Sequence, residues 1–229
     1  FMAYILHLET STKQCSVALA FEGKLLKSRV LNLNSFSHSE KLHLFINEVL
    51  QEAGLTPKDL GAIAISKGPG SYTGLRIGVA AAKGLCFALD LPLIALNSLE
   101  VMVIPQNTDG FDYIIPMLDA RRMEVYTAIF DAEKKWVQET SALVLSEDAY
   151  LDIVGSKRCL LFGDGASKLK ELQSKINAKY LPEVHFPNAE DMVAMAWVKF
   201  SKNDFESLAY FEPFYLKDFQ VTPPKQQKI

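Results

Sequence analysis

Cysteine and histidine are scarce in this chain of 229 residues, and their scarcity excludes several kinds of protein. The three cysteines, Cys15, Cys86 and Cys159, are odd in number and far apart, which fits reduced thiols in a cytosol better than a disulfide framework. The four histidines form no His-Glu-x-x-His motif, so a zinc peptidase would lack its ligands. No serine stands in a Gly-x-Ser-x-Gly elbow, so a serine peptidase is not indicated either.

The sequence also has no large excess of one charge and no long apolar run. The net charge of −3 provides no basic surface for nucleic acid, so a role on nucleic acid would have to be shared with a partner. The longest apolar region, 77–96, is interrupted by Lys83, Asp90 and Pro92 and is not a membrane span. No secretory signal is visible, and we interpret Phe1 before Met2 as an expression remnant. We therefore expect a cytoplasmic protein that binds no membrane.

The order of apolar patterns predicts an α/β protein in two lobes. In the first half, alternation and helical spacing predict strands at 4–8, 15–19, 25–33, 62–65 and 93–96 and helices at 37–53 and 71–89. A polar connector at 105–110 has turn chemistry, and we place the boundary between the lobes there. The second half predicts strands at 113–118, 125–130, 136–145 and 159–162, with helices after Ser146, from 166 to about 178, and after a cap at Asn188.

The most informative stretch is the loop and helix that follow the strand at 62–65. Gly68-Pro69-Gly70 leads directly into the helix, and such a turn aims several backbone N–H groups at one point, which is an anion-binding geometry. No Gly-Lys-Ser/Thr closes the loop, so it is not a Walker A motif.

Small residues recur on one side of this helix. Gly74, Gly78 and Ala82 are spaced by four and form a stripe almost free of side chains. A glycine inside a helix costs about 1 kcal/mol relative to alanine, so something must pack very closely against the stripe. The stripe faces either the protein's own sheet or a helix of a partner chain. The second alternative predicts that Gly78→Leu abolishes partner binding and leaves the monomer folded.

The motif Gly-Pro-Gly-Ser-Tyr-Thr-Gly-Leu-Arg-Ile-Gly-Val (68–79), followed by Ala-Lys-Gly-Leu (82–85), resembles the TsaB (YeaZ) family. Asp-Ala-Arg-Arg-Met-Glu-Val-Tyr (119–126) and Glu-Pro-Phe-Tyr-Leu-Lys (212–217) resemble two further family motifs, although Arg122 and Met123 depart from the first. The resemblance implies the actin-like, Hsp70-like ATPase superfamily fold: two ribonuclease-H-like lobes, each a mixed sheet flanked by helices. We assign residues 1–106 to the N-terminal lobe with the partner-binding helices and 107–229 to the C-terminal lobe.

The resemblance also implies where a vestigial nucleotide cleft would lie. The superfamily's phosphate-facing turns correspond here to Glu9-Thr10-Ser11-Thr12 and to the hairpin at Asp119, and its adenosine loop corresponds to Gly163-Asp164-Gly165. The cleft would be lined by Glu9, Thr10, Gly70, Asp119, Gly163 and Gly165. Glu9 stands where the family has aspartate. The alternatives are an ordinary polar turn at 9–12 and a capped surface hairpin at Asp119.

No metal site and no catalytic residue are expected. In the paralogous TsaD family two metal-binding histidines lie four residues apart, and the matching positions here are Ser98 and Met102, which do not make a hard-metal site. His38 and His43 are five apart and are interpreted as surface residues. Relatives have carried a glycoprotease label, but the ligands of a zinc peptidase are missing here.

The resemblance implies a non-catalytic scaffold subunit required for N6-threonylcarbamoyladenosine (t6A) at adenosine 37 of tRNAs that read ANN codons. The chain would form a heterodimer with a TsaD-type catalytic paralogue, which would hold ATP and metal. A TsaE-type ATPase would join the complex, a TsaC-type enzyme would supply the activated threonylcarbamoyl group, and tRNA would be bound only through the complex. Alone, the chain would form a homodimer. The alternative is an ATP-binding enzyme of the actin-like fold with its own nucleotide site.

The predicted partner interface lies on the helices 37–53 and 71–89. It comprises Leu42, Phe45, Val49, Thr73, Gly74, Arg76, Ile77, Gly78, Ala81 and Ala82.

Overall fold

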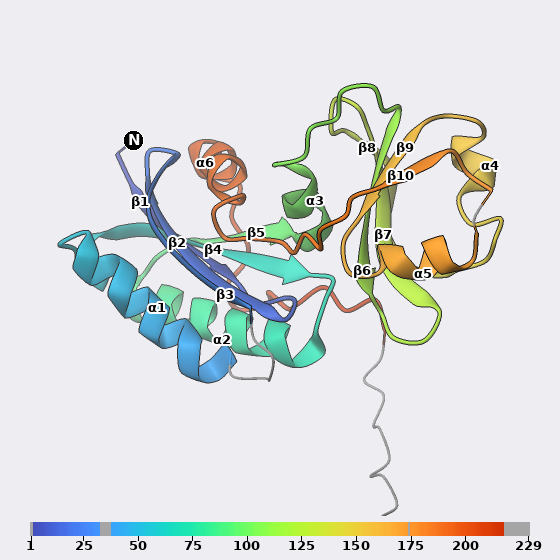
Figure 1. Cartoon of the computed structure of the whole chain (residues 1–229). Helices are drawn as coiled ribbons and strands as arrows, with labels where there is room; N and C mark the ends of the chain where they lie inside the picture. Colours follow the sequence, from blue (N-terminus) through green and yellow to red (C-terminus); the bar gives the residue numbers. More distant parts are fainter. Residues whose placement is uncertain (1, 33–37, 174, 218–229) are drawn as a thin grey trace, which may run out of the picture.

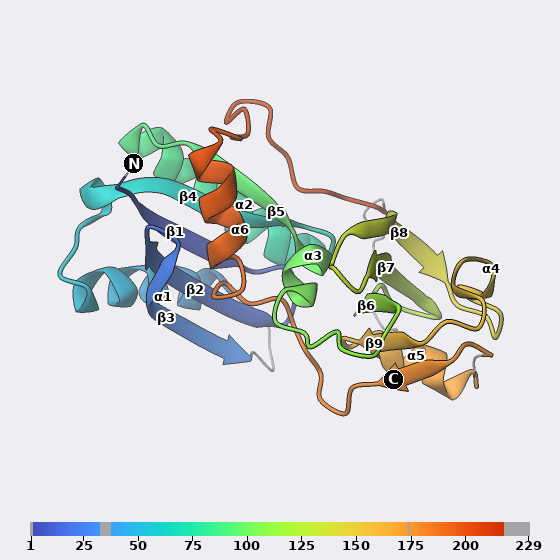
Figure 2. The ribbon, with the colours of Figure 1, turned by 90° about the horizontal axis from the view of Figure 1, so that it is seen from above.

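The structure is a computed structural model, and it describes residues 2–32, 38–173 and 175–217 (Figure 1). Residue 37, where the first predicted helix begins, lies outside these ranges, as does the side chain of His38. Figure 2 shows two lobes side by side, each built on its own sheet.

The first lobe is a five-stranded mixed sheet in the order β3-β2-β1-β4-β5. Its strands are β1 (Tyr4–Glu9), β2 (Gln14–Phe21), β3 (Lys24–Asn32), β4 (Leu60–Gly68) and β5 (Leu93–Asn97). β1 and β3 each pair with β2 in antiparallel fashion, whereas β1, β4 and β5 run parallel. Helices α1 (His38–Glu52) and α2 (Tyr72–Leu89) cover one face of this sheet, and α6 (Val193–Ser201) covers the other (Figure 1).

The second lobe repeats this order. Its sheet, β10-β9-β6-β7-β8, consists of β6 (Tyr113–Asp119), β7 (Glu124–Asp131), β8 (Trp136–Val144), β9 (Cys159–Phe162) and β10 (Ala178–Tyr180). The strands β6, β7 and β8 form an antiparallel meander, and β9 and β10 join β6 in parallel. Each lobe therefore has a three-stranded meander extended by two parallel strands, and the predicted two-lobed α/β fold is confirmed.

Three short helices complete the lobes. η1 (Pro57–Asp59) precedes β4, and α4 (Leu151–Val154) and α5 (Ala166–Glu171) pack on the second sheet. No helix in the described ranges is long and apolar enough to span a membrane.

Helix α3 (Ser98–Val103) connects the lobes. Its N-cap Asn97 accepts hydrogen bonds from the amides of Leu99 and Glu100 through Oδ1, and its Nδ2 donates to Thr140 of β8 at 2.9 Å. Leu99, Met102 and Val103 of α3 belong to the same core as the facing side of the second sheet, whereas Val101 packs in the core against the first sheet. α3 is thus a fixed attachment between the lobes.

Two local predictions were wrong. The helix predicted over 166–178 ends at Glu171, and residues 178–180 pair with β9 instead, because Gln173 turns the chain with a φ of 52°. Asn188 does not cap a helix: its side chain accepts a hydrogen bond from the Glu190 amide at 3.3 Å, and α6 begins five residues later.

The division of the chain at residues 106 and 107 stays a prediction. α6, which that division assigns to the C-terminal lobe, packs on the first sheet through Met192 and Ala196. The chain therefore returns to the first lobe after completing the second.

Candidate functional site

The glycine stripe of α2 faces its own lobe. A Cβ atom added at Gly74 would lie 2.0 Å from the carbonyl oxygen of Thr10, and one added at Gly78 would lie 2.2 Å from Thr10 Oγ1. Ala82 is fully buried in the core of the first lobe. The prediction that the stripe contacts a partner chain was therefore wrong, because the connection between β1 and β2 occupies that side of the helix. Gly78→Leu would overpack this core rather than block a docking surface.

The connection between β1 and β2 also contacts the first residues of α2. The Ser71 amide donates to the Ser11 carbonyl at 2.6 Å, and Thr10 Oγ1 donates to the Gly74 carbonyl at 2.8 Å. A Cβ at Gly70 would lie 2.1 Å from the Ser11 oxygen. At this helix N-terminus, the Ser71 amide is thus bonded to the protein's own backbone, and the backbone of Ser11 occupies the space beside Gly70.

Glu9 lies beside this contact and is fully buried. Its Oε1 accepts a hydrogen bond from the Ser11 amide at 2.5 Å, whereas its Oε2 and the Ser11 hydroxyl have no hydrogen-bond partner. Burial raises the pKa of the Glu9 carboxyl to about 7, which outweighs the lowering effect of the surrounding donor groups. On the same strand, burial lowers the pKa of the His7 imidazole to about 4.

The residues predicted to line the cleft from the second lobe also make contacts within the protein itself. Asp119 is exposed and pairs with Lys168 at 2.7 Å, and its amide donates to Asp164 Oδ1 at 2.8 Å. A Cβ at Gly163 would lie 2.2 Å from the Met117 oxygen, and one at Gly165 would lie 2.7 Å from Val125, so both glycines serve packing between neighbouring strands. Burial raises the pKa of Asp164.

The two positions that match the TsaD histidines are buried and used in packing. Ser98 and Ser66 share a hydrogen bond of 2.7 Å between their hydroxyls, and Met102 lies in the core between α3 and the second sheet. Within residues 2–32, 38–173 and 175–217 there is no cluster of three or more histidine, cysteine or acidic side chains able to hold a metal ion.

The accessible parts of α2 are the side away from the stripe and the flank that meets α1. Of the predicted interface residues, Leu42, Phe45, Val49, Gly74, Gly78 and Ala82 are buried in the isolated lobe, whereas Thr73, Arg76, Ile77 and Ala81 reach the surface. A shallow apolar groove of about 470 Å³ lies between α1 and α2 and is lined by His43, Ile77, Ala80, Ala81, Gly84 and Leu85. Beyond it, Phe87 is 84% exposed on α2. We call this groove with Phe87 the outer face of α1 and α2.

Sequence reasoning missed Ala80, Gly84, Leu85 and Phe87. Helical spacing alone could have placed Ala80, Gly84 and Phe87 away from the stripe, whereas Leu85, seven residues after Gly78, lies beside it and packs against the first core. Helical spacing does not determine which side of α2 packs against the sheet of its own lobe.

Comparison with known proteins places this geometry in a family. A family model described as TsaD, tRNA N6-adenosine threonylcarbamoyltransferase, matches residues 32–221. A Haemophilus influenzae relative named "tRNA threonylcarbamoyladenosine biosynthesis protein TsaB" is 29% identical over 224 residues, which is 93% of each chain. The solved structure "YeaZ from Pseudomonas aeruginosa" superimposes with a TM-score of 0.79 at 28% identity over 94% of this chain and 100% of that one. The chain belongs to the TsaB (YeaZ) family.

The family likeness extends to the paralogue. A Thermus thermophilus protein named "tRNA N6-adenosine threonylcarbamoyltransferase" is 35% identical over 111 residues, which is 42% of this chain and 34% of that protein. This chain thus shares part of its sequence with a protein named as a transferase.

The packing of α2 predicts opposite outcomes for two glycine substitutions on one helix. Gly74→Ala should lower the free energy of unfolding by about 1–3 kcal/mol, because the new methyl group overlaps a backbone oxygen. Gly84→Ala should raise it by about 1 kcal/mol, because nothing lies within 4 Å and alanine is the better helix former. Urea unfolding of both variants measures this. Equal changes in the free energy of unfolding for the two variants would contradict the conclusion that the stripe packs in the core.

The buried carboxyl of Glu9 should make the stability of the chain depend on pH. Its pKa is about 7 in the folded chain and about 4.5 unfolded, so the folded state binds the proton more tightly. The contribution of Glu9 to the free energy of unfolding is therefore fully present below pH 4.5. About 3 kcal/mol of it is lost as the pH rises to 7, because ionisation of the buried carboxyl is unfavourable in the folded state. Glu9→Gln cannot ionise and should escape this loss.

The stability of Glu9→Gln relative to wild type should therefore rise by about 3 kcal/mol between pH 4.5 and 7, and the contribution of His7 cancels in the difference. The exposed substitution Glu183→Gln is the matched control. A difference between Glu9→Gln and wild type that stays constant with pH would show that the buried carboxyl does not titrate in this range.

Proposed function

We propose that this chain acts in the biosynthesis of threonylcarbamoyladenosine in tRNA as a non-catalytic subunit. It pairs with a TsaD-type catalytic paralogue, and in its absence with a second copy of itself. The paralogue holds ATP and metal, a TsaE-type ATPase joins the pair, and tRNA is bound through the whole complex. The names and extent of the relatives support the pathway, and the geometry of the first lobe supports the role.

The observation that carries the non-catalytic role is the contact between the β1–β2 connection and the start of α2. The Ser71 amide is already bonded to Ser11, and Gly70 and Gly74 lie against backbone oxygens. A phosphate group would have to displace this contact before it could reach the helix N-terminus. The buried positions Ser98 and Met102 add no metal ligand nearby. These features argue against the alternative of an ATP-binding enzyme.

The outer face of α1 and α2 supports partner binding. It combines an apolar groove with exposed Phe87, and small residues at Ala80, Ala81 and Gly84 leave room for another helix to approach closely. Interfaces whose cores are apolar with an aromatic anchor are typical of stable subunit pairs. We propose that the paralogue's helices pack here.

Reconstitution tests this proposal. The paralogue, the TsaE-type and TsaC-type proteins and an ANN-reading tRNA should form threonylcarbamoyladenosine only when this chain is added. Ala80→Glu should weaken binding to the paralogue at least about tenfold and reduce product, because an unpaired carboxylate would be buried in the groove.

Val198→Glu places the same charge on the exposed side of α6 and is the matched control, with expected wild-type behaviour. Product formed equally well without the chain would refute the subunit role. Equal loss of binding in both variants would refute the assignment of the surface.

A further inference from the structure

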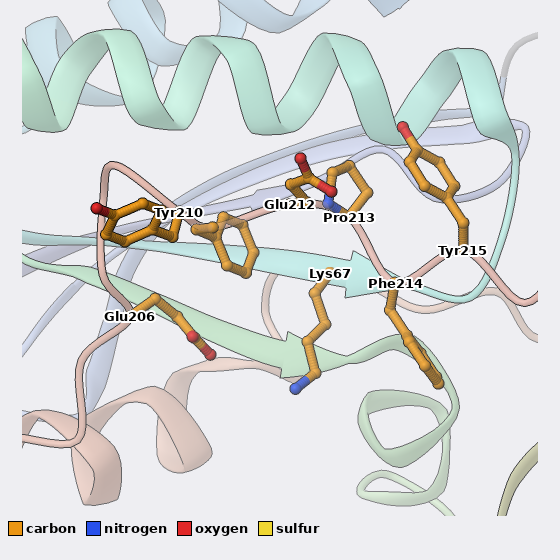
Figure 3. Close-up of a pocket in the computed structure, with 8 residues that line it drawn as sticks. Lys67, Glu206, Tyr210, Glu212, Pro213, Phe214 and Tyr215 are labelled. Carbon is orange, nitrogen blue, oxygen red and sulfur yellow. The ribbon is translucent and has the colours of Figure 1, made fainter.

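The C-terminal strap, residues 206–217, crosses from the first lobe to the second and is tied to both. It begins where the Glu206 amide donates to the Leu93 carbonyl of the edge strand β5 at 2.8 Å. Figure 3 shows the strap passing below α2, with the side chains of Tyr210 and Tyr215 on the same segment as Glu212 and Pro213. A hollow of about 530 Å³ lies between the strap and Lys67.

Four further contacts hold the strap to the first lobe. Phe211 is buried in the core under α2, and its carbonyl accepts a hydrogen bond from Lys83 of α2 at 2.9 Å. The Phe214 amide donates to the Lys67 carbonyl at 2.7 Å. The ring of Tyr215 packs on that of Tyr72, with 4.8 Å between centroids. Two of these ties are to α2 itself.

Within residues 206–217, the side chain of Lys217 ties the strap to the second lobe. Lys217 pairs with Glu124 of β7 and donates a hydrogen bond to the Ala120 carbonyl, both at the hairpin between β6 and β7. Figure 1 shows the segment reaching the lower end of the second sheet at this point. The pair is partly buried, with 28% of the Lys217 side chain and 21% of the Glu124 side chain exposed.

The lobes are therefore joined in three places: by α3, by the segment 181–192 between β10 and α6, and by the strap. α3 is packed into the second core by several apolar side chains, whereas the strap relies on a charge pair that one substitution removes. A rotation of one lobe about α3 would have to move the segment 181–192 and to stretch or break the tie at Lys217.

We propose that the strap couples the outer face of α2 to the orientation of the second lobe, with Lys217 as the positioning residue. This inference rests on the proposed function, since it gives the paralogue that covers α2 a mechanical connection to the other lobe. The ties to Tyr72 and Lys83 lie on the helix that the partner would cover. A partner that favours one lobe orientation would then bind less well to a chain whose strap has been released.

Distances between spin labels test the coupling. Labels at Lys202→Cys in the first lobe and Lys170→Cys in the second use exposed positions, and the three native cysteines are buried. Lys217→Glu should broaden the distance distribution of the free chain, and the charge-swapped pair Lys217→Glu with Glu124→Lys should narrow it again. Lys157→Glu, which breaks the ion pair with Asp112 inside the second lobe, should leave it unchanged.

Binding of the paralogue gives the second readout. Lys217→Glu should weaken it about fivefold or more, and the charge-swapped pair should restore it. Direct contact between Lys217 and the partner would not be rescued in this way, because position 217 stays acidic.

If the label distances in Lys217→Glu equal those of the wild type, Lys217 does not hold the lobes in one orientation. If the distances change but the affinity for the paralogue does not, the strap does not couple the lobes to partner binding. Should the wild-type chain not bind the paralogue at all, the proposed function fails. The distance measurement on the free chain still decides the tie in that case.

Discussion

The contact between the Thr10–Ser11 connection and the small-residue side of α2 is the constraint on which the first lobe depends. It requires glycine at 70, 74 and 78, because any side chain there would overlap the backbone or side chain of the connection. It draws α2 onto the sheet, closes the start of the helix, and buries Glu9 behind it. With this side of α2 used internally, the apolar groove toward α1 and exposed Phe87 remain at the surface, where we propose that a partner binds.

The two lobes share a strand order but differ in how their polar groups are used. In the first lobe the polar groups at the strand ends are buried, with Glu9 and Ser11 incompletely hydrogen-bonded. In the second, Asp119 lies at the surface and is balanced by Lys168. A repeated fold with both phosphate-facing turns engaged internally is consistent with a scaffold that leaves chemistry to its paralogue.

Much of the architecture could be predicted from the sequence, because the strand and helix patterns of both lobes are regular and the motif at 68–79 is long. The side on which Gly74 and Gly78 pack could not, since helical spacing defines a stripe but not its neighbour. The prediction of a helix as far as Ala178 was wrong because residues 178–180 pair with β9, and this pairing outweighs their local helix propensity. The strap was invisible for a different reason: its ties, such as Lys217 to Glu124, join residues far apart in the chain.

Amide hydrogen exchange of the chain with and without the TsaD-type paralogue tests the central claim most directly. Binding should increase protection in α1, in α2 and along the strap, and should leave the edge strand β3, on the far side of the first sheet from β5, unchanged. Protection that appeared instead at β3 or at α6, with α1 and α2 unaffected, would contradict the assignment of the outer face as the docking surface.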